Sequence, residues 1–422
     1  VVGALVVLGI ACAPILVSVF AAGYADQPDR YNLTVSLTRW MFPYLGLVSV
    51  VGFMGGIANS HGRFGAAAAS PVLFNVFIIS GAVLPMAFLP EPIYGLAVGV
   101  VVGGLAQVAL LSGDLMAGKC TITPVWEPKA KGLPEAWRLM VPQLFGIAIY
   151  QINIIVLRTY ASFLEEGAVT QYYNASRLQE LALGVFAVAL ATASQPRFAR
   201  MHAARDRRGM SELFTRSVRG ILVINLGAAA GLMALAMPIC IVLYRHGAFT
   251  WEATVLTADT LFWLGVALVP VGLVRMVGQV FYAFKQARKP VVAGFWAMLC
   301  NAAFGALFCS LYGVKGLGMG LAVATTVQAV LLLYWLLPQL EFWVRTSLLG
   351  ATARCLLAAC VMGVPLYFST QWFLWDASSV KAGVALFGFI GAGGFIYLVL
   401  CYALRFDEIS DILDRIARKV RG

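Results

Sequence analysis

Long apolar runs separated by short polar segments dominate this chain. A helix needs about 20 apolar residues to cross a bilayer. Runs of roughly that length occupy residues 1–22, 38–58, 71–89, 93–113, 139–159, 171–195, 220–244, 254–284, 290–312, 317–338, 350–370 and 382–404. The pattern therefore predicts an all-α polytopic membrane protein with twelve membrane-spanning helices in these 422 residues.

The sixth apolar run is interrupted by a polar stripe. Thr170, Tyr173, Asn174, Arg177 and Glu180 are spaced i, i+3, i+4, i+7 and i+10, so they share one face of a helix. An arginine inside a membrane span costs about 2.5–3.5 kcal/mol on insertion scales and usually serves a function. The stripe indicates the wall of a water-filled cavity. The alternative is that Arg177, which lies only about 10 Å along the helix from the start of the span, snorkels to the outer interface. Its pair with Glu180 would then be a structural clamp between helices.

The distribution of lysine and arginine predicts the orientation of the spans. With a cytoplasmic N-terminus, 22 of these residues fall on the inner side and 6 on the outer side, as the positive-inside rule requires. The net charge of +11 therefore follows from topology and from attraction to anionic membrane lipids, and nucleic acid is not an expected partner. The segment Phe406–Val420 has one apolar face, which predicts an amphipathic helix on the cytoplasmic membrane surface.

Composition supports a membrane protein and argues against an enzyme. The chain is 61% hydrophobic and only 12% charged, with a mean hydropathy of +0.86, which is typical of membrane proteins. Its 8 cysteines and 3 histidines are scattered, so neither a disulfide framework nor a metal site is expected. An enzyme such as a polyprenyl-phosphate transferase would need clustered acids, and the predicted loops have only the pair Glu165-Glu166 on the outer side and isolated acids elsewhere. We expect a transporter without a cofactor.

An internal repeat divides the chain into related halves. A shift of 226 residues aligns Leu45–Gly52 (LGLVSVVG) with Val271–Gly278 (VGLVRMVG), and it also aligns Asn75 with Asn301. The two segments lie in the second and eighth predicted spans, six helices apart. Repeats of six helices suit a transporter in which two lobes rock about a central site.

The repeat also predicts the domain organisation. Because the second unit begins near Trp137, about ninety residues, enough for two spans, would precede Val1 in the complete protein. We therefore expect an N-terminally truncated chain and fourteen helices in the full-length protein, made of two six-helix lobes and two extra C-terminal helices. The predicted parts are the remaining four helices of the N-terminal lobe at 1–116, a cytoplasmic linker at 117–138, the C-terminal lobe at 139–338, a final helix pair at 339–404 and a cytoplasmic tail at 405–422.

Four motifs resemble those of one known family. They are RWMFPYLGL at Arg39–Leu47, YYNASRLQE at Tyr172–Glu180, LYRHGAFT at Leu243–Thr250 and FYAFKQARKP at Phe281–Pro290. In this order and spacing they resemble the MurJ/MviN lipid II flippases of the multidrug/oligosaccharidyl-lipid/polysaccharide exporter superfamily. The resemblance covers essentially the whole chain, beginning at the third helix of the family.

The resemblance implies a function in cell-wall synthesis. Such flippases carry the undecaprenyl-pyrophosphate-linked peptidoglycan precursor across the bacterial inner membrane by alternating access, and so support cell-wall biogenesis and cell shape. The family has a cationic central cavity, and Arg177, Thr170 and Glu180 match residues of its eighth helix. Its last two helices, which correspond to 350–404, form a groove for the lipid tail. The other cavity arginines of the family lie on its first two helices, which this chain would lack.

These considerations define a set of substrate-binding residues. Arginine suits a pyrophosphate because its planar fork replaces part of the hydration of the anion. Glu180 would hold or neutralise the guanidinium, and polar side chains would bind sugar or peptide. Arg275 is the weakest candidate, because helix packing or snorkelling explains it equally well. The full set is Arg177, Glu180, Asn174, Thr170, Asn153, Gln151 and Arg275.

Alternatives remain open from the sequence. An exporter of another lipid-linked oligosaccharide or of drugs, from the same superfamily, would have twelve helices in the whole protein. A scaffold role is disfavoured by the polar stripe. Asp114 and Asp259 lie near span ends, where interfacial acids are more usual than ion-coupling sites. We expect a monomer in contact with membrane lipids, and we expect a coupling ion or the membrane potential to drive transport.

Overall fold

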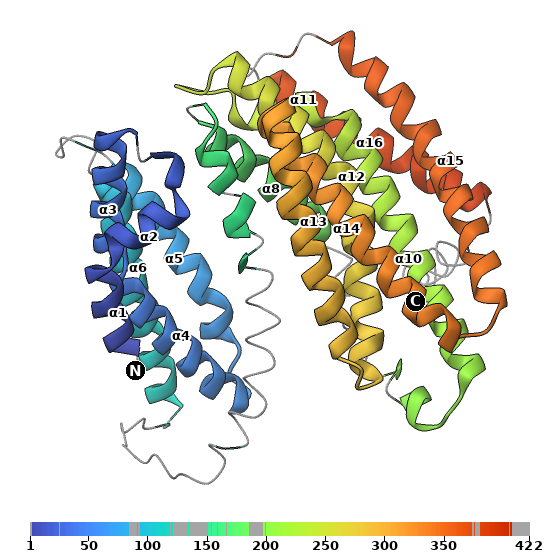
Figure 1. Cartoon of the computed structure of the whole chain (residues 1–422), viewed down its shortest axis with the longest axis horizontal. Helices are drawn as coiled ribbons and strands as arrows, with labels where there is room; N and C mark the ends of the chain where they lie inside the picture. The colour runs from blue at the N-terminus through green and yellow to red at the C-terminus, as the bar shows by residue number, and fades with distance from the viewer. Residues whose placement is uncertain are drawn as a thin grey trace. The chain divides into compact units, whose positions relative to one another are not determined.

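The computed structural model describes most of the chain as helix (Figure 1). The residues that it describes are 2–24, 26–83, 91, 93–118, 120, 134, 151–152, 154–157, 159–165, 167–184, 197–198, 200–373, 375, 380–404 and 406. Contacts within the chain divide it into two compact units, Val1–Leu139 and Met140–Gly422. Each unit is considered by itself below.

The first unit is built around one long helix. Its elements are α1 (Val2–Ala11), α2 (Ala13–Phe20), η1 (Ala22–Tyr24), α3 (Pro28–Met41), α4 (Pro43–Ser60), α5 (Gly65–Val83) and α6 (Ile93–Ala117). Helix α6 packs most extensively against α5, next against α4, and then against α3. Two residues of this helix, Leu111 and Leu115, are almost completely buried beside Met54 and Ala58 of α4.

Glycines on α6 allow the close approach of α5. Gly95, Gly99 and Gly103 recur every four residues, so they form one small-residue stripe of the kind that brings helices together in membranes. A Cβ atom added at Gly99 would lie 2.7 Å from the carbonyl oxygen of Phe77, and one at Gly103 would lie 2.9 Å from Cδ2 of Phe74. Neither position therefore has room for a side chain.

The first predicted span differs from its expected form. Residues 1–22 were expected to form a single membrane-spanning helix, but the chain bends by 73° between α1 and α2. Proline occupies the first turn of α2, and its ring nitrogen has no hydrogen to donate to the preceding turn. Pro14 therefore accounts for the break near Cys12, which an average over 20 residues does not register.

The second unit contains the longest helices. Its elements are α8 (Ala168–Gly184), α10 (Arg207–Ala234), α11 (Ala236–Tyr244), α12 (Trp251–Ala283), α13 (Arg288–Tyr312), α14 (Val314–Leu336), η3 (Leu337–Gln339), α15 (Trp343–Gln371) and α16 (Val380–Ala403). Helix α14 lies against both α13 and α12, while α15 lies along α10 and α16 contacts α15 and α10. The side chain of Asp206 caps α10 by accepting a hydrogen bond from the Gly209 amide at 2.8 Å.

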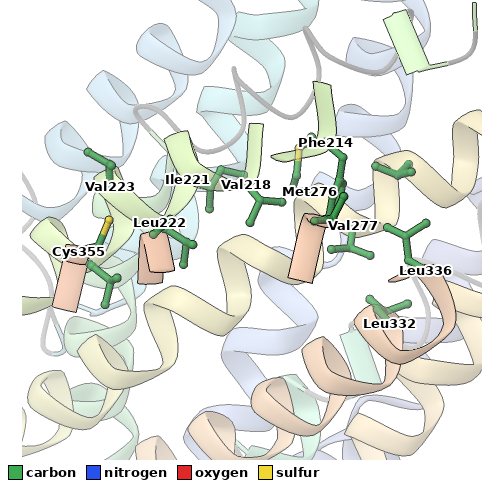
Figure 2. Close-up of a cluster of buried hydrophobic side chains, with 14 of the residues drawn as sticks. Phe214, Val218, Ile221, Leu222, Val223, Met276, Val277, Leu332, Leu336 and Cys355 are labelled. Atoms are coloured by element: carbon green, nitrogen blue, oxygen red, sulfur yellow. The ribbon is translucent and has the colours of Figure 1, made fainter. Parts of the chain in front are cut away.

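Four of these helices contribute most of the main apolar core. Figure 2 shows its side chains converging from α10, α12, α14 and α15. Burial of such side chains is complete or nearly complete, with relative exposures of 3% or less at several of them. They include Phe214, Ile221 and Leu222 of α10, Met276 and Val277 of α12, Leu332 and Leu336 of α14, and Cys355 of α15. Helix α12 is thus held on several sides by neighbouring helices.

The structure confirms a multi-pass helical membrane protein, although not the expected number of spans. Among the described residues, nine helices are long and apolar enough to cross a membrane, or ten if the bent pair α1–α2 is one span. The count of twelve is not confirmed. Most of the run at 139–159 lies outside the described residues, as do the end of the run at 171–195 and residues 407–422 of the predicted amphipathic tail.

Candidate functional site

Helix α8 carries the polar stripe, and a glycine sets where it begins. Gly167 has φ of +92°, a left-handed conformation that costs glycine little because it has no Cβ. Its carbonyl oxygen then accepts a hydrogen bond from the amide of Gln171 at 2.9 Å. The chain therefore turns at Gly167, and the helix follows directly from Ala168 to Gly184.

The buried face of α8 fixes the rotation of the helix. Tyr172, Ala175, Gln179 and Leu183 are all buried, with relative exposures of 8%, 0%, 5% and 3%. The amide Nε2 of Gln179 donates a hydrogen bond to the carbonyl oxygen of Leu264 on α12 at 2.8 Å. A buried amide without such a partner would be costly, so this contact anchors α8 against α12 in one orientation.

The opposite face of α8 presents the polar stripe. Thr170, Tyr173, Arg177 and Glu180 are exposed within the second unit, and Asn174 is half-buried. The backbone carbonyl of Asn174 accepts a hydrogen bond from the Tyr244 hydroxyl at 3.3 Å. Four of the predicted site residues are therefore brought together on one helix, with most of their side chains pointing away from the core of this unit.

The guanidinium of Arg177 is held by two side chains of its own helix. Its Nη1 lies 2.8 Å from Oε2 of Glu180 and forms an ion pair. Its Nη2 donates a hydrogen bond to the Tyr173 hydroxyl at 2.9 Å, and its Cζ stands 4.8 Å from the centre of the Tyr173 ring. The Arg177 and Glu180 side chains are 56% and 48% exposed. They thus remain accessible to a ligand.

The other three predicted site residues, Gln151, Asn153 and Arg275, do not belong to α8. Gln151 is exposed, in a helical segment that precedes α8, and Asn153 lies outside the described residues. Arg275 is half-buried on α12, next to the buried Met276. Within the described part of the chain, no hydrogen bond or ion pair joins Arg275 to Tyr173 or Glu180, the two partners of Arg177. The structure does not bring Arg275 together with the stripe.

Two contacts near the stripe were not predicted as parts of the site. Tyr173 was placed on the polar face but left out of the substrate-binding set, although its spacing of four residues before Arg177 is a signal for contact. Gln179 was not singled out. Its partner Leu264 is 85 residues away, and no local pattern reveals a contact of that kind.

The acids near span ends form structural ion pairs. Asp114 on α6 receives two hydrogen bonds from Arg63, from Nε at 3.0 Å and from Nη2 at 2.6 Å. The hydrogen bond with Asp114 raises the pKa of the Arg63 guanidinium above its usual value. Asp259 on α12 accepts a hydrogen bond from Lys315 at 3.2 Å. Among the described residues, no group of three or more histidine, cysteine, aspartate or glutamate residues is arranged to hold a metal ion.

An apolar cavity of about 990 Å³ lies within the second unit. Its walls come from α10, α11, α12, α15 and the segment just after α15, and nearly all of the lining side chains are apolar. Polar groups include Arg245, Asp259 and Gln371. Arg245 is stacked on Trp251, with its Cζ 4.8 Å from the ring centre. The cavity therefore combines an apolar body with a few charged and polar groups.

Comparison with known families gives one consistent result. The profile of the family described as "Lipid II flippase MurJ" matches residues 1–386. A Bdellovibrio bacteriovorus protein named "Probable lipid II flippase MurJ" is 30% identical over 421 residues, covering 97% of this chain and 78% of that relative. A Vibrio cholerae protein of the same name is 28% identical over 408 residues, covering 94% and 77%.

Solved structures share the fold. The structure titled "Lipid II flippase MurJ, inward closed conformation" superposes with a TM-score of 0.79 at 21% identity, covering 97% of this chain and 82% of that one. An inward-facing multidrug resistance transporter of the MATE family gives a TM-score of 0.70 at 16% identity, covering 83% and 80%. At these identities the likeness concerns the fold alone.

Proposed function

Because this chain belongs to the lipid II flippase MurJ family, we propose that it moves lipid II across the bacterial cytoplasmic membrane for peptidoglycan synthesis. The observation that carries the proposal for the site is the exposed polar face of α8, with Arg177 at its centre. A cation within a membrane span is costly and usually serves a charged ligand, even where a neighbouring carboxylate such as Glu180 pairs with it in the ligand-free protein. The pyrophosphate of a lipid-linked precursor is such a ligand.

The proposed binding mode assigns different parts of the substrate to different features. Arg177 binds the pyrophosphate, since its planar fork pairs well with phosphate oxygens. Thr170 and Asn174, and with them Gln151 and Asn153, hydrogen-bond the sugar or the peptide. The apolar cavity beside α15 accepts part of the lipid tail, because transfer of hydrocarbon into an apolar site is favourable. Arg275 stays the weakest member of this set.

Alternating access completes the proposed mechanism. Two lobes that rock about a central site would expose the α8 stripe first to the cytoplasm and then to the outer side. The protein transfers its substrate without making or breaking a covalent bond, so the proposal includes no catalytic residue and no cofactor. A monomeric state, and coupling to an ion or to the membrane potential, stay predictions.

Complementation tests the role of Arg177. Cells depleted of their own lipid II flippase should be rescued by the gene but not by its Arg177→Ala variant at equal protein level. Arg208→Ala is the matched control, because Arg208 is also an arginine on a helix and pairs with Glu212 one turn later at 3.2 Å. The control should rescue. Full rescue by Arg177→Ala would contradict the proposed site.

A further inference from the structure

Glu180 occupies the position on Arg177 that a phosphate would need. Arginine binds a phosphate best through two parallel N–H donors, which engage two oxygens at once. In this structure Nη1 donates to Glu180 and Nη2 donates to Tyr173. The terminal edge of the guanidinium is thus already divided between two side chains of the same helix.

The two partners differ in what happens when an anion arrives. The carboxylate of Glu180 and a phosphate are both negative, and like charges that share one site repel each other. The hydroxyl of Tyr173 is neutral, and its ring also lies 4.8 Å from the Arg177 Cζ, an arrangement that attracts the cation. An incoming phosphate therefore displaces Glu180 and leaves Tyr173 in place.

The spacing along the helix makes this exchange local. Tyr173 lies four residues before Arg177 and Glu180 three residues after it, so all three side chains share one face. The Glu180 side chain is 48% exposed, which gives it room to leave by a change of rotamer. No movement of the backbone is required.

We propose that Glu180 is a built-in competitor for the pyrophosphate, which returns to Arg177 and promotes release, and that Tyr173 is a positioning residue that keeps the guanidinium in place throughout. This inference rests on the proposed function, since it concerns the same site. A transporter must bind its substrate and also let it go, and an attached counter-anion weakens the bound state without removing the cation. Glu180 thus tunes the site toward turnover.

The test measures binding of farnesyl pyrophosphate to the purified protein in detergent micelles, with farnesol as the uncharged control. Replacing Glu180 by glutamine removes the competing charge but keeps its size. Exposed ion pairs contribute about 0.2–1 kcal/mol, so Glu180→Gln should tighten binding about 1.5- to 5-fold. The gain should appear as faster association, because the position on Arg177 is no longer occupied, and as slower dissociation, because the repelling charge is gone, and farnesol binding should not change.

Two tyrosine variants test the positioning role. Tyr173→Phe loses the hydroxyl hydrogen bond but keeps the ring, and it should weaken farnesyl pyrophosphate binding about 2- to 10-fold. Tyr173→Leu loses both contacts and should bind more weakly than the phenylalanine variant. Equal effects of the two variants, or tighter binding by Tyr173→Phe, would overturn this part of the proposal.

The remaining outcomes separate this inference from the proposed function. Glu212→Gln, which removes an acid that pairs with Arg208 on α10, is the control for a general charge effect and should leave binding unchanged. If Arg177→Gln abolishes binding but Glu180→Gln leaves it unchanged or weakens it, the competitor role is wrong and the site stands. If Arg177→Gln binds farnesyl pyrophosphate normally, the proposed site itself is wrong.

Discussion

The contact between Asn225 of α10 and Gly272 of α12 predicts a strong coupling between two substitutions. Asn225 is fully buried, and its Nδ2 donates a hydrogen bond to the carbonyl oxygen of Leu268 at 3.3 Å. A Cβ atom at Gly272 would overlap this Nδ2, and it would lie 3.0 Å from Cγ of Asn225 and 3.3 Å from Cγ2 of Ile221. Gly272→Ala therefore cannot be accommodated while Asn225 keeps its position.

The expected free energies follow from these contacts. Overpacking of a tight core costs about 1–3 kcal/mol, which is the loss expected for Gly272→Ala beyond any gain in helix propensity. Asn225→Ala should cost less. Hydrogen bonds between membrane helices contribute about 0.6 kcal/mol on average, and the Oδ1 of Asn225 has no partner among the described residues. In the double variant the overlap with the amide is gone, so most of the loss at position 272 should disappear.

A double-mutant cycle measures this coupling. Unfolding is followed in mixed micelles of detergent and SDS for the four proteins. Gly231→Ala on α10 is the matched control, because a Cβ atom there would meet no atom within 4 Å. It reports the gain from replacing glycine by alanine in a helix, about 0.8–1.0 kcal/mol. We expect a coupling of about 1–2 kcal/mol; strict additivity of the two substitutions would refute the steric argument.

Each of three further predictions concerns a contact inside one of the two units. Gly99→Leu should separate α5 from α6 and lower the unfolding temperature, because a Cβ atom there meets a backbone oxygen at 2.7 Å. Gly113→Leu on the same helix is the control and should have little effect, since a Cβ atom there meets no atom within 4 Å. Equal effects of the two variants would argue against the glycine stripe. Tyr397→Phe removes a hydrogen bond of 2.7 Å from the Tyr397 hydroxyl on α16 to the Val223 carbonyl. It should lower the free energy of unfolding, measured by SDS titration, by about 0.5–1.5 kcal/mol. An unchanged midpoint would mean that this bond does not anchor α16. Reversing the charge of either Arg63 or Asp114 alone should lower the unfolding temperature, and exchanging the two residues should restore most of the lost stability. If the exchanged protein is no more stable than the single variants, then the ion pair does not fasten the turn that follows α4 to helix α6.

Local patterns in the sequence predicted most of the helices that the structure contains. The apolar runs at 254–284, 290–312, 317–338 and 382–404 coincide within a few residues with α12, α13, α14 and α16. This agreement has a simple cause, because the length of an apolar run is a local property and the bilayer sets how long it must be. Breaks within a run are shorter than the averaging window, and the bend near Cys12 was missed for that reason.

The site was predictable to the extent that it lies on one helix. The face shared by Thr170, Tyr173, Arg177 and Glu180 follows from 3.6 residues per turn, and the structure places these side chains on that exposed face of α8. The contacts that orient the face were not predictable. The bond from Gln179 to the Leu264 carbonyl joins residues 85 positions apart, and only the folded chain brings them together.

The internal repeat places a proline at nearly the same point of two long spans. Pro28–Ser60 and Trp251–Ala283 are both candidate spans of 33 residues, and the shift of 226 residues places Pro43 next to the position of Pro270. Phe42, between α3 and α4, has a helical φ of −56° and ψ of −35°, so the first span continues past Pro43 as α12 continues through Pro270. The most apolar window of the first span is 11% buried and that of the second is 50% buried. Proline removes the same backbone donor in both spans, yet both helices pass it, so the single missing hydrogen bond ends neither of these spans, whether the span is sparsely buried or well packed.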